Sequence, residues 1–425
     1  MGRPPVPRHS YTVEVLAPAE QTARVVEEPL RAEIVVGVHG GPSADPSDTI
    51  RAGHRVGRQL GAAYPGRRAV VLLLSDGAAE NAPPLPSEPR APAPEVPLLP
   101  WRHPGQSALE AVLWAVESLE AAACALVAAE GDDAPADTAY HLVRPVLEDG
   151  IDLACACYAT HRYEGVLTTG LVYPLTRALY GKRLRQPLGH ELALSRRAVA
   201  HLLGEAWHAD AARAGEPIWL VTALLAGDFQ VGQAYLGARP PRLADAGADL
   251  AVSLAQVVGL LFHEARLHAP AWQRLKGSRP VRTYGELASP PGEPGQPQVG
   301  PMIAAFQLGY QELQQVWGAV LPPQTLLALK RLSRAPEESF SLDDGLWARV
   351  VYDFAVGYHL AIMDRALLLR SMTPLYLAWA AGFVREVREL SSAGVEERCE
   401  RLSRGFELAK PYLISRWRWP DRFNP

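Results

Sequence analysis

The sequence predicts an α/β protein in which a sheet of mostly parallel strands is followed by a region built of helices. Two observations predict this fold class. Up to residue 158, short runs of β-branched and aliphatic residues alternate with helical patterns, the rhythm of right-handed βαβ units in an open sheet. From residue 250 onward, apolar residues recur instead at the spacing of amphipathic helices.

The predicted strands are short and continuously apolar, as expected of strands buried on both faces. They cover residues 32–38, 68–74, 123–128 and 151–158. Helical patterns separate them over residues 47–62, 107–122 and 138–147. Ser47 or Asp48 is predicted to cap the first of these helices. The proline-rich stretch 83–100 is predicted to be a surface loop.

Long helices are predicted in the C-terminal part, over residues 250–266, 302–320, 346–369 and 374–390. A Gly/Pro stretch at 289–301 interrupts them. One apolar stripe, made of Trp347, Val351, Phe354 and Tyr358, favours core packing between helices. We therefore expect an N-terminal extension at 1–30, a sheet domain at 31–250 and a helical domain at 251–425 that packs on the sheet or forms a homodimer.

Composition excludes several classes of function. The chain has 425 residues and a net charge of −4, which argues against binding nucleic acid or anionic lipid through bulk charge. No unbroken apolar run reaches the roughly 18 to 20 residues of a membrane span, and the N-terminus lacks the apolar core of a signal peptide. A cytoplasmic location is the expectation. The four cysteines, including the Cys155-x-Cys157 pair, are predicted to be buried core thiols.

Acidic turns follow two predicted strands, at the strand ends where such sheets bind ligands. Asp76, between Ser75 and Gly77, can accept a hydrogen bond from a base or a ribose, or can simply stabilise a turn. Glu130, Asp132 and Asp133 can hold a hard cation through oxygen ligands, or can form an acidic turn that faces solvent. Both interpretations of each turn stay open.

A dense polar cluster follows the fourth predicted strand. It begins with the segment 161–165 and continues with Thr168, Thr169, Arg177, Lys182, Arg183 and Arg185. Hydroxyls, glycine and guanidinium groups together suit a phosphate or a carboxylate, because arginine binds such groups with two parallel hydrogen bonds. A solvated helix end has a similar composition. Glu191, a little further on, is either a ligand residue or an ion-pair partner.

The segment 173–189, YPLTRALYGKRLRQPLG, resembles a bacterial family of GT-A glycosyltransferases that is related to glucosyl-3-phosphoglycerate synthases and mannosylglycerate synthases. The similarity also covers residues 48–50, 75–77, 218–219, 236–238, 346–353 and 373–376. It implies a GT-A sheet domain, which is the Rossmann-like fold of nucleotide-diphospho-sugar transferases, followed by an α-helical C-terminal domain.

The sequence departs from this family where the sugar donor would bind. An Asp-x-Asp turn that holds a divalent metal in such enzymes falls on Ala128-Ala129-Glu130. Two further changes affect the metal and sugar positions: Pro241 replaces a metal-site histidine, and Gly189-His190-Glu191 replaces a Gly-Gly-Asp stretch. Two loops also differ: His39-Gly40-Gly41-Pro42 replaces a Pro-Ser-Tyr-Asn type of loop, and Pro104-Gly105-Gln106-Ser107 replaces a glycine-lysine segment. On the acceptor side, Val166 replaces an arginine of the acceptor loop.

The resemblance implies a hexosyltransferase that moves a sugar from a nucleoside-diphosphate sugar to a small anionic, phosphoglycerate-like acceptor. In that interpretation Mg²⁺ or Mn²⁺ neutralises the leaving diphosphate. The implied roles are nucleotide binding by His39, Ser75, Asp76 and Gly77, metal binding by Glu130, Asp132 and Asp133, a catalytic place beside the sugar for Glu191, and acceptor binding by Arg162, Gly165, Thr168, Thr169 and Arg185. The alternative is a catalytically inactive homologue that serves as a binding or partner subunit.

Overall fold

The computed structural model describes residues 31–40, 45–74, 96–101, 107–129, 137–205, 216–238, 250–286, 288 and 295–421. Contacts within the chain define two compact units. The first unit comprises residues 1–154 and 190–205, and the second comprises residues 155–189 and 206–425. The domain boundaries expected near residues 30 and 250 remain predictions.

The first unit is built on a mixed sheet whose strands lie in the order β7-β4-β1-β2-β3. These strands are β1 (Ile34–His39), β2 (Ala69–Leu74), β3 (Leu98–Trp101), β4 (Ala123–Ala128) and β7 (Leu192–Ser195). β1 is parallel to both β2 and β4, β2 is parallel to β3, and β7 is antiparallel to β4. The α/β class and the strands predicted at 32–38, 68–74 and 123–128 are confirmed, because their continuous apolar runs are buried on both faces.

Strand β3 was missed, because residues 83–100 were predicted to be a loop throughout. Its register pairs Leu98 with Val71 and Pro100 with Leu73. Proline lacks the amide hydrogen that a central strand needs, but β3 is the last strand of the sheet that the described residues form. An edge position therefore tolerates a sequence that argues against a strand elsewhere.

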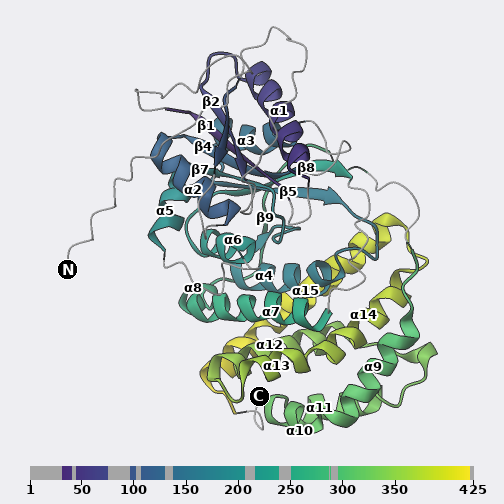
Figure 1. The fold of residues 1–425 in the computed structure, drawn as a ribbon. Coiled ribbons are helices and arrows are strands. Elements are labelled where there is room, and N and C mark those ends of the chain that lie inside the picture. Colours follow the sequence, from purple (N-terminus) through teal and green to yellow (C-terminus); the bar gives the residue numbers. More distant parts are fainter. Residues whose placement is uncertain are drawn as a thin grey trace, which may run out of the picture. The chain divides into compact units, whose positions relative to one another are not determined.

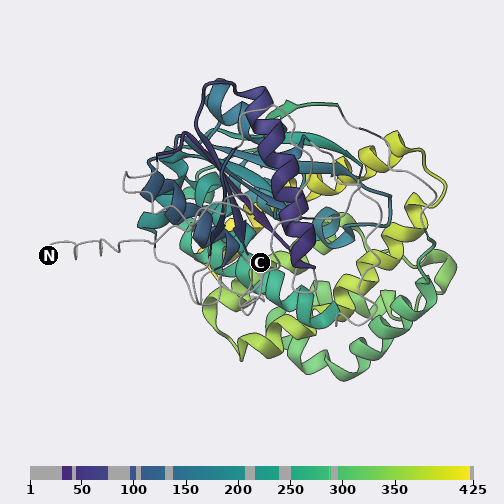
Figure 2. The same ribbon diagram turned by 45° about the horizontal axis from the view of Figure 1, so that its top comes forward.

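Among the described residues of this unit, four helices accompany the sheet: α1 (Pro46–Ala63), α2 (Ala108–Leu119), α3 (Thr138–Glu148) and α5 (Arg196–Gly204). Helix α1 lies along the strands of its unit (Figure 1 and Figure 2). Its cap is Asp45, which accepts a hydrogen bond from the Ser47 amide, so the cap predicted at Ser47 or Asp48 was wrong. Helix α2 approaches β1 closely at Gly37, where an added Cβ would lie 2.4 Å from Cγ2 of Val112.

The second unit contains the strands β5 (Leu153–Ala159), β8 (Val231–Ala238) and β10 (Arg282–Tyr284), in the order β10-β8-β5. The first two residues of β5 belong to the first unit. A separate pair of short parallel strands joins β6 (Lys182–Arg183) to β9 (Arg279–Pro280).

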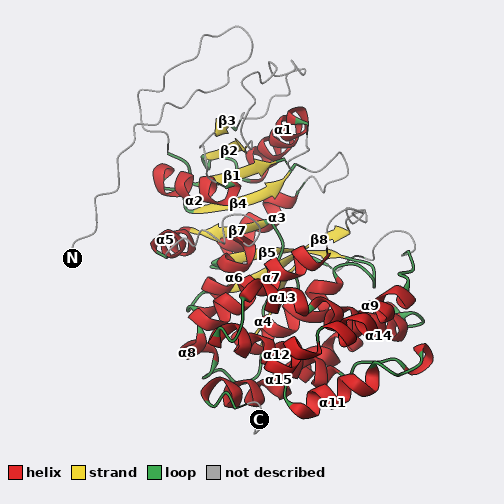
Figure 3. Ribbon diagram, turned by 60° about the horizontal axis from the view of Figure 1, so that its bottom comes forward, coloured by secondary structure: helices red, strands yellow, loops and turns green. Residues whose placement is uncertain are grey.

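Helices make up most of the second unit, and after β10 the described residues form helices and connections only (Figure 3). Those before β10 are the π-helix η1 (Thr168–Val172), α4 (Tyr173–Tyr180), α6 (Glu216–Ala226), α7 (Leu250–Leu267) and α8 (Ala269–Trp272). Those after it are α9 (Val299–Glu312), α10 (Gln314–Val320), α11 (Pro323–Leu332), the 3₁₀ turn η2 (Glu337–Ser339), α12 (Asp344–Leu360), α13 (Arg365–Ser371), α14 (Thr373–Val387) and α15 (Ser392–Arg418).

Two of the predicted long helices are broken in the structure. The stretch 346–369 ends a first helix at Ala361, which adopts a left-handed conformation with φ of 50°. A new helix then begins behind Asp364, whose side chain caps the Leu367 amide. The stretch 302–320 is likewise divided, between α9 and α10. Apolar periodicity runs through both breaks, so it could not locate them.

The apolar stripe of α12 forms part of the core, as predicted. Trp347, Val351 and Phe354 are completely buried. The ring of Trp347 stacks on that of Trp379, with centroids 6.1 Å apart. All four cysteines are free and buried, and burial raises the pKa of both Cys124 and Cys155 to about 12. The prediction of core thiols is confirmed.

By length and composition, two helical stretches among the described residues could cross a membrane: Leu250–Leu267 and Arg365–Val387. For the second, 72% of the apolar window is buried inside the protein, and for the first 44%. Core helices of globular proteins pass the same test, so these stretches are weak evidence for a membrane span.

Candidate functional site

The carboxyl ends of three parallel strands in the first unit lie at one level of the sheet. The strand register pairs His39 with Leu74 on one side and with Ala128 on the other. The amide of Ala129 donates to the carbonyl of His39 at 2.8 Å and continues this alignment beyond the strand ends. Parallel sheets bind ligands at such an edge.

Most of the predicted donor-side residues lie outside the described residues. Ser75, Asp76 and Gly77 follow the end of β2 in the sequence, and Glu130, Asp132 and Asp133 follow the end of β4. Their roles in binding a nucleotide and a metal stay predictions. The structure describes His39, the last residue of β1, and Glu191, the residue that precedes β7.

Glu191 lies at the carboxyl end of β4. Its side-chain Oε1 accepts a hydrogen bond from the amide of Ala128 at 3.3 Å. The residue is only 4% exposed. The antiparallel register of β4 and β7, which pairs Leu126 with Leu192, brings Glu191 to this place. A buried carboxylate needs hydrogen-bond partners to offset its lost hydration, and a strand-end amide provides one.

The described residues do not form a metal site. Among them, no group of three or more histidine, cysteine, aspartate or glutamate side chains could hold a metal ion. Ala128, where the resemblance places the first metal carboxylate, has no ligand atom in its side chain. Glu191 and His39 alone do not complete a ligand set, and the predicted ligands Glu130, Asp132 and Asp133 lie outside the described residues.

The predicted acceptor-side residues belong to the second unit and follow the end of β5. Gly165 has φ of +59°, a left-handed conformation that glycine adopts without strain, and its carbonyl accepts from the Thr169 amide at 2.9 Å. Thr168 and Thr169 then begin the π-helix η1. Nη1 of Arg162 donates to the carbonyls of Val387 and Arg388 at 2.8 and 2.7 Å, so this guanidinium satisfies the carboxyl end of α14.

Two glutamines fix the backbone around this loop. The side-chain amide of Gln186 donates to the carbonyl of Tyr158 at 2.7 Å, and its oxygen accepts from the Tyr158 amide at 3.0 Å. Oε1 of Gln233, on β8, accepts from the backbone amide of Arg185 at 3.1 Å. The sequence did not indicate these roles, because nothing in the local pattern places either glutamine opposite its partner.

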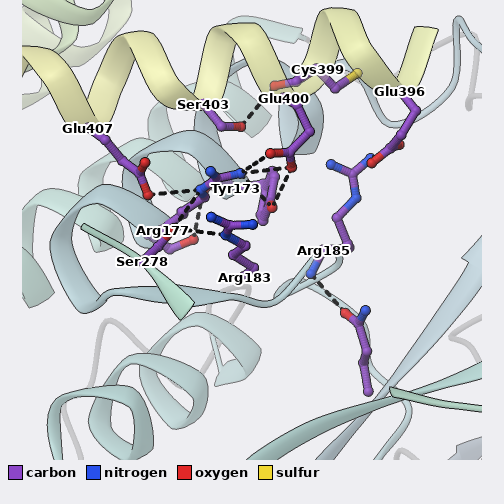
Figure 4. Close-up of polar contacts among 12 residues, drawn as sticks. Tyr173, Arg177, Arg183, Arg185, Ser278, Glu396, Cys399, Glu400, Ser403 and Glu407 are labelled. Atoms are coloured by element: carbon purple, nitrogen blue, oxygen red, sulfur yellow. Dashed lines mark hydrogen bonds and ion pairs between the residues drawn. The ribbon is translucent and has the colours of Figure 1, made fainter. Parts of the chain in front are cut away.

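Arg185 is held from two sides. Its guanidinium lies over the ring of Tyr173, 4.7 Å from the centroid. Its Nη2 pairs with Oε2 of Glu396 at 2.7 Å, and the two side chains point toward each other in Figure 4. The side chain of Arg185 is 24% exposed and that of Glu396 is 54% exposed. Glu396 was not among the predicted site residues, because 211 positions separate it from Arg185.

Arg177, by contrast, forms ion pairs in the interior of the protein. Its side chain is fully buried, and its Nη1 lies 2.8 Å from both carboxylate oxygens of Glu400. Its Nε donates to Oε1 of Glu407 at 3.0 Å and to Oγ of Ser278 at 3.1 Å (Figure 4). Arg183 donates to the same Ser278 oxygen. Arg177 therefore joins α4 to α15.

The geometry thus defines a class of protein: a mixed α/β sheet with polar groups at its strand ends, continued by a helical region. No protein-family model and no curated protein matches the chain. Solved structures do. One is glucosyl-3-phosphoglycerate synthase from Mycobacterium tuberculosis in complex with Mn²⁺, uridine diphosphate and glucosyl-3-phosphoglycerate; it is 19% identical, with 55% of this chain and 80% of that chain covered and a TM-score of 0.35.

The same synthase in complex with phosphoglyceric acid is 16% identical, with the same coverage and a TM-score of 0.33. A structure described only as a mycobacterial protein is 21% identical over 55% of this chain and 74% of that one, with a TM-score of 0.37. These solved structures include the kind of enzyme that the sequence resembles. At such identities and TM-scores, the likeness carries no argument about activity.

Proposed function

We propose that this protein transfers a sugar from a nucleoside-diphosphate sugar to a small anionic acceptor of the phosphoglycerate type. The observation that carries the proposal is the position of Glu191. A buried carboxylate lies against the backbone of Ala128, at the strand end where the sequence resemblance puts the diphosphate of the donor. Ligands bind at this edge of parallel sheets, so the carboxylate of Glu191 is placed where a sugar donor would lie.

Glu191 would act on the transferred sugar. Departure of the diphosphate leaves positive charge on the anomeric carbon, and a fixed carboxylate next to that carbon stabilises the charge as it develops. The same oxygens can accept hydrogen bonds from sugar hydroxyls and so orient the ring. Because the Ala128 amide already fixes the carboxylate, little rearrangement is needed when the donor binds.

The nucleotide is proposed to lie along the ends of β1 and β2, against His39, Ser75, Asp76 and Gly77. The resemblance also implies Mg²⁺ or Mn²⁺, with Glu130, Asp132 and Asp133 as its proposed ligands. The described residues do not supply such a site, so the proposed mechanism takes no step through a metal. Whether donor binding depends on a metal is part of the test below.

The acceptor is proposed to bind in the second unit, at the loop that follows β5. Gly165, Thr168 and Thr169 offer backbone amides and hydroxyls, and Arg185 offers a guanidinium that suits a phosphate or a carboxylate. Arg162 is a proposed acceptor contact as well, although its Nη1 is bound to α14 carbonyls. A guanidinium held in this way can position the loop for its ligand.

The first experiment is thermal unfolding with a panel of UDP-, GDP- and ADP-sugars, each with and without Mg²⁺ or Mn²⁺. A donor present at about 100 times its dissociation constant adds about 2.7 kcal/mol to the free energy of unfolding, which is an easily measured shift. Stabilisation by one donor supports the proposal, and dependence on the metal would assign a cation to the donor side. No response to any donor would remove the transferase proposal.

The second candidate function is a catalytically inactive homologue that serves as a binding or partner subunit. The alanine at position 128 favours it, because the resemblance places a metal carboxylate there. The two candidates differ in turnover. Donor binding without formation of a glycosylated acceptor, tested with phosphoglycerate, would support the inactive homologue.

A further inference from the structure

The two arginines predicted to bind the acceptor are both engaged by the segment 387–396, which runs from the end of α14 into the first turns of α15. Arg162 binds the carbonyls of Val387 and Arg388. Arg185 binds the carboxylate of Glu396. Carbonyl oxygens and a carboxylate are the kind of acceptor atoms that an anionic ligand would offer to the same guanidinium groups.

The guanidinium of Arg185 is only half used. Nη2 donates to Glu396, whereas Nη1 is shielded from solvent and has no hydrogen-bond partner among the described residues. A charged donor that is withdrawn from water without a partner is unfavourable. A phosphate or carboxylate in the plane of the guanidinium would bind Nη1 and Nη2 together, the arrangement that arginine prefers with oxyanions.

Glu396 is also easy to displace. Its side chain is 54% exposed, and it forms a single ion pair through one oxygen. Because Glu396 is more than half exposed, solvent screens this ion pair and weakens it. The neighbouring ion pairs of Arg177 differ in exposure and in number. The guanidinium of Arg177 is fully buried, and it pairs with two carboxylates, Glu400 and Glu407. An incoming anion would therefore exchange with Glu396 and leave the pairs of Arg177 in place.

We propose that Glu396 is an internal substitute for the anionic group of the acceptor. In the empty protein its carboxylate pairs with Arg185 and keeps the guanidinium stacked on Tyr173. An acceptor phosphate or carboxylate then displaces Glu396 and takes both nitrogens of Arg185. Glu396 thus competes with the acceptor and sets its affinity. This inference rests on the proposed function for the identity of the ligand, and the experiment separates the two.

The test is calorimetric titration of the full chain with phosphoglycerate and with inorganic phosphate, in the absence of any donor. The variants Glu396→Gln and Glu396→Ala remove the competing charge. Relative to the unaltered protein, we expect both to bind phosphoglycerate about three to five times more tightly, the effect of removing one partly exposed ion pair. The matched control is Glu397→Gln, which removes the same charge from the adjacent exposed position of α15.

A double-mutant cycle with Arg185→Gln checks that the effect passes through Arg185. Glutamine removes the positive charge for which Glu396 and the anion compete. The Arg185→Gln variant should bind the anion more weakly, and Glu396→Gln should then no longer tighten binding. Thermal unfolding of each variant verifies that it is folded.

Three results would overturn the inference: equal effects of Glu396→Gln and Glu397→Gln, tightening that persists in Arg185→Gln, and no binding of either anion by any variant. The proposed function fails separately. If Glu396→Gln tightens anion binding while no sugar donor binds, the inference stands and the transferase does not. If sugar is transferred but the variants at 396 and 397 bind alike, the transferase stands and the inference does not.

Discussion

Single side chains carry the chemistry proposed for this protein, and substitution of Glu191 tests that chemistry most directly. Replacing it by glutamine keeps the shape and an oxygen for the Ala128 amide but removes the negative charge. If the charge stabilises the developing positive centre, we expect the kcat of sugar transfer to fall about 100-fold, with stability changed by less than about 1 kcal/mol. Product formation measured by chromatography checks this.

The control for Glu191→Gln is Glu117→Gln, which removes a carboxylate from an exposed position on α2 in the same unit. It should leave kcat unchanged. Equal rates for Glu191→Gln and the unaltered protein would show that the buried carboxylate has no part in transfer.

Arg177 illustrates a different use of charge at the residue scale. It is fully buried and forms ion pairs with two glutamates. It also donates a hydrogen bond to the uncharged hydroxyl of Tyr173. Replacing Arg177 by methionine removes the ion-pair partner of Glu400 and Glu407. We expect a loss of about 3 kcal/mol in the free energy of unfolding, measured by urea denaturation.

Arg279→Met is the comparison for that measurement, because Arg279 is exposed on β9 and lies in the same unit. Surface substitutions of this kind change stability by about 0.5 kcal/mol or less. A loss at position 177 no greater than that at 279 would mean that the buried network contributes nothing to stability.

At the scale of secondary-structure elements, the π-helix η1 packs against α14 with no space to spare. A Cβ added to Gly170 would lie 2.0 Å from the ring of Trp379. The Gly170 carbonyl also accepts a hydrogen bond from Nε1 of Trp347 at 2.8 Å. Gly170→Ala should therefore destabilise the protein by about 2 to 3 kcal/mol through overpacking.

Gly318 provides the matched glycine for this test. It lies inside helix α10, and no atom lies within 4 Å of an added Cβ. There, alanine should raise the free energy of unfolding by about 0.5 to 1 kcal/mol, because glycine weakens a helix interior. If both alanine variants change the free energy of unfolding in the same direction, the close packing of Gly170 against Trp379 does not limit stability.

The longest helix in the described part of the chain, α15, was not predicted. Its sequence is rich in charge, and several of its charged side chains are buried: Arg398, Lys410 and Arg416. Arg398 pairs with Asp344 and Glu386, while Lys410 donates to the carbonyls of Leu179 and Leu275. A helix that buries its charges by pairing them has no clean apolar stripe, so the periodic pattern that reveals other helices is missing.

At the scale of the whole molecule, the pH dependence of the free energy of unfolding tests the ionisation of Asp353. This aspartate is 1% exposed and accepts from Tyr412 and Arg416. Burial raises its pKa to about 6, and the hydrogen bond from Tyr412 and the charge of Arg416 oppose that rise only in part. Between about pH 4 and pH 6 the folded protein therefore holds a proton that the unfolded chain has released.

The sign follows from this difference in bound protons. As pH rises from about 4 to 6, the contribution of Asp353 to the free energy of unfolding falls, by about 2 to 3 kcal/mol for a shift of this size. Asp353→Asn cannot titrate and lacks this fall. Denaturation of both proteins across that range should give a stability difference that changes in favour of the asparagine variant as pH rises. A difference that stays constant with pH would assign Asp353 an ordinary pKa.

The sequence by itself determined the α/β class, the buried strands of the first unit and the apolar helices of the second. These follow from local pattern, because a strand buried on both faces and an amphipathic helix each leave a periodic signature over consecutive residues. The core role of Trp347, Val351 and Phe354 followed in the same way. The sequence also supplied Glu191 and Arg185 as candidates, though only through residue type and resemblance.

Only the tertiary structure decided what those candidates touch. The contact of Glu191 with Ala128 spans 63 positions, and the pair of Arg185 with Glu396 spans 211. It also decided that Arg177 is a buried anchor, that β3 occupies a sheet edge and that the long apolar stretches break at Ala361 and between α9 and α10. Such outcomes depend on residues brought together from distant positions, and local periodicity carries no information about which distant partner will satisfy a charge or end a helix.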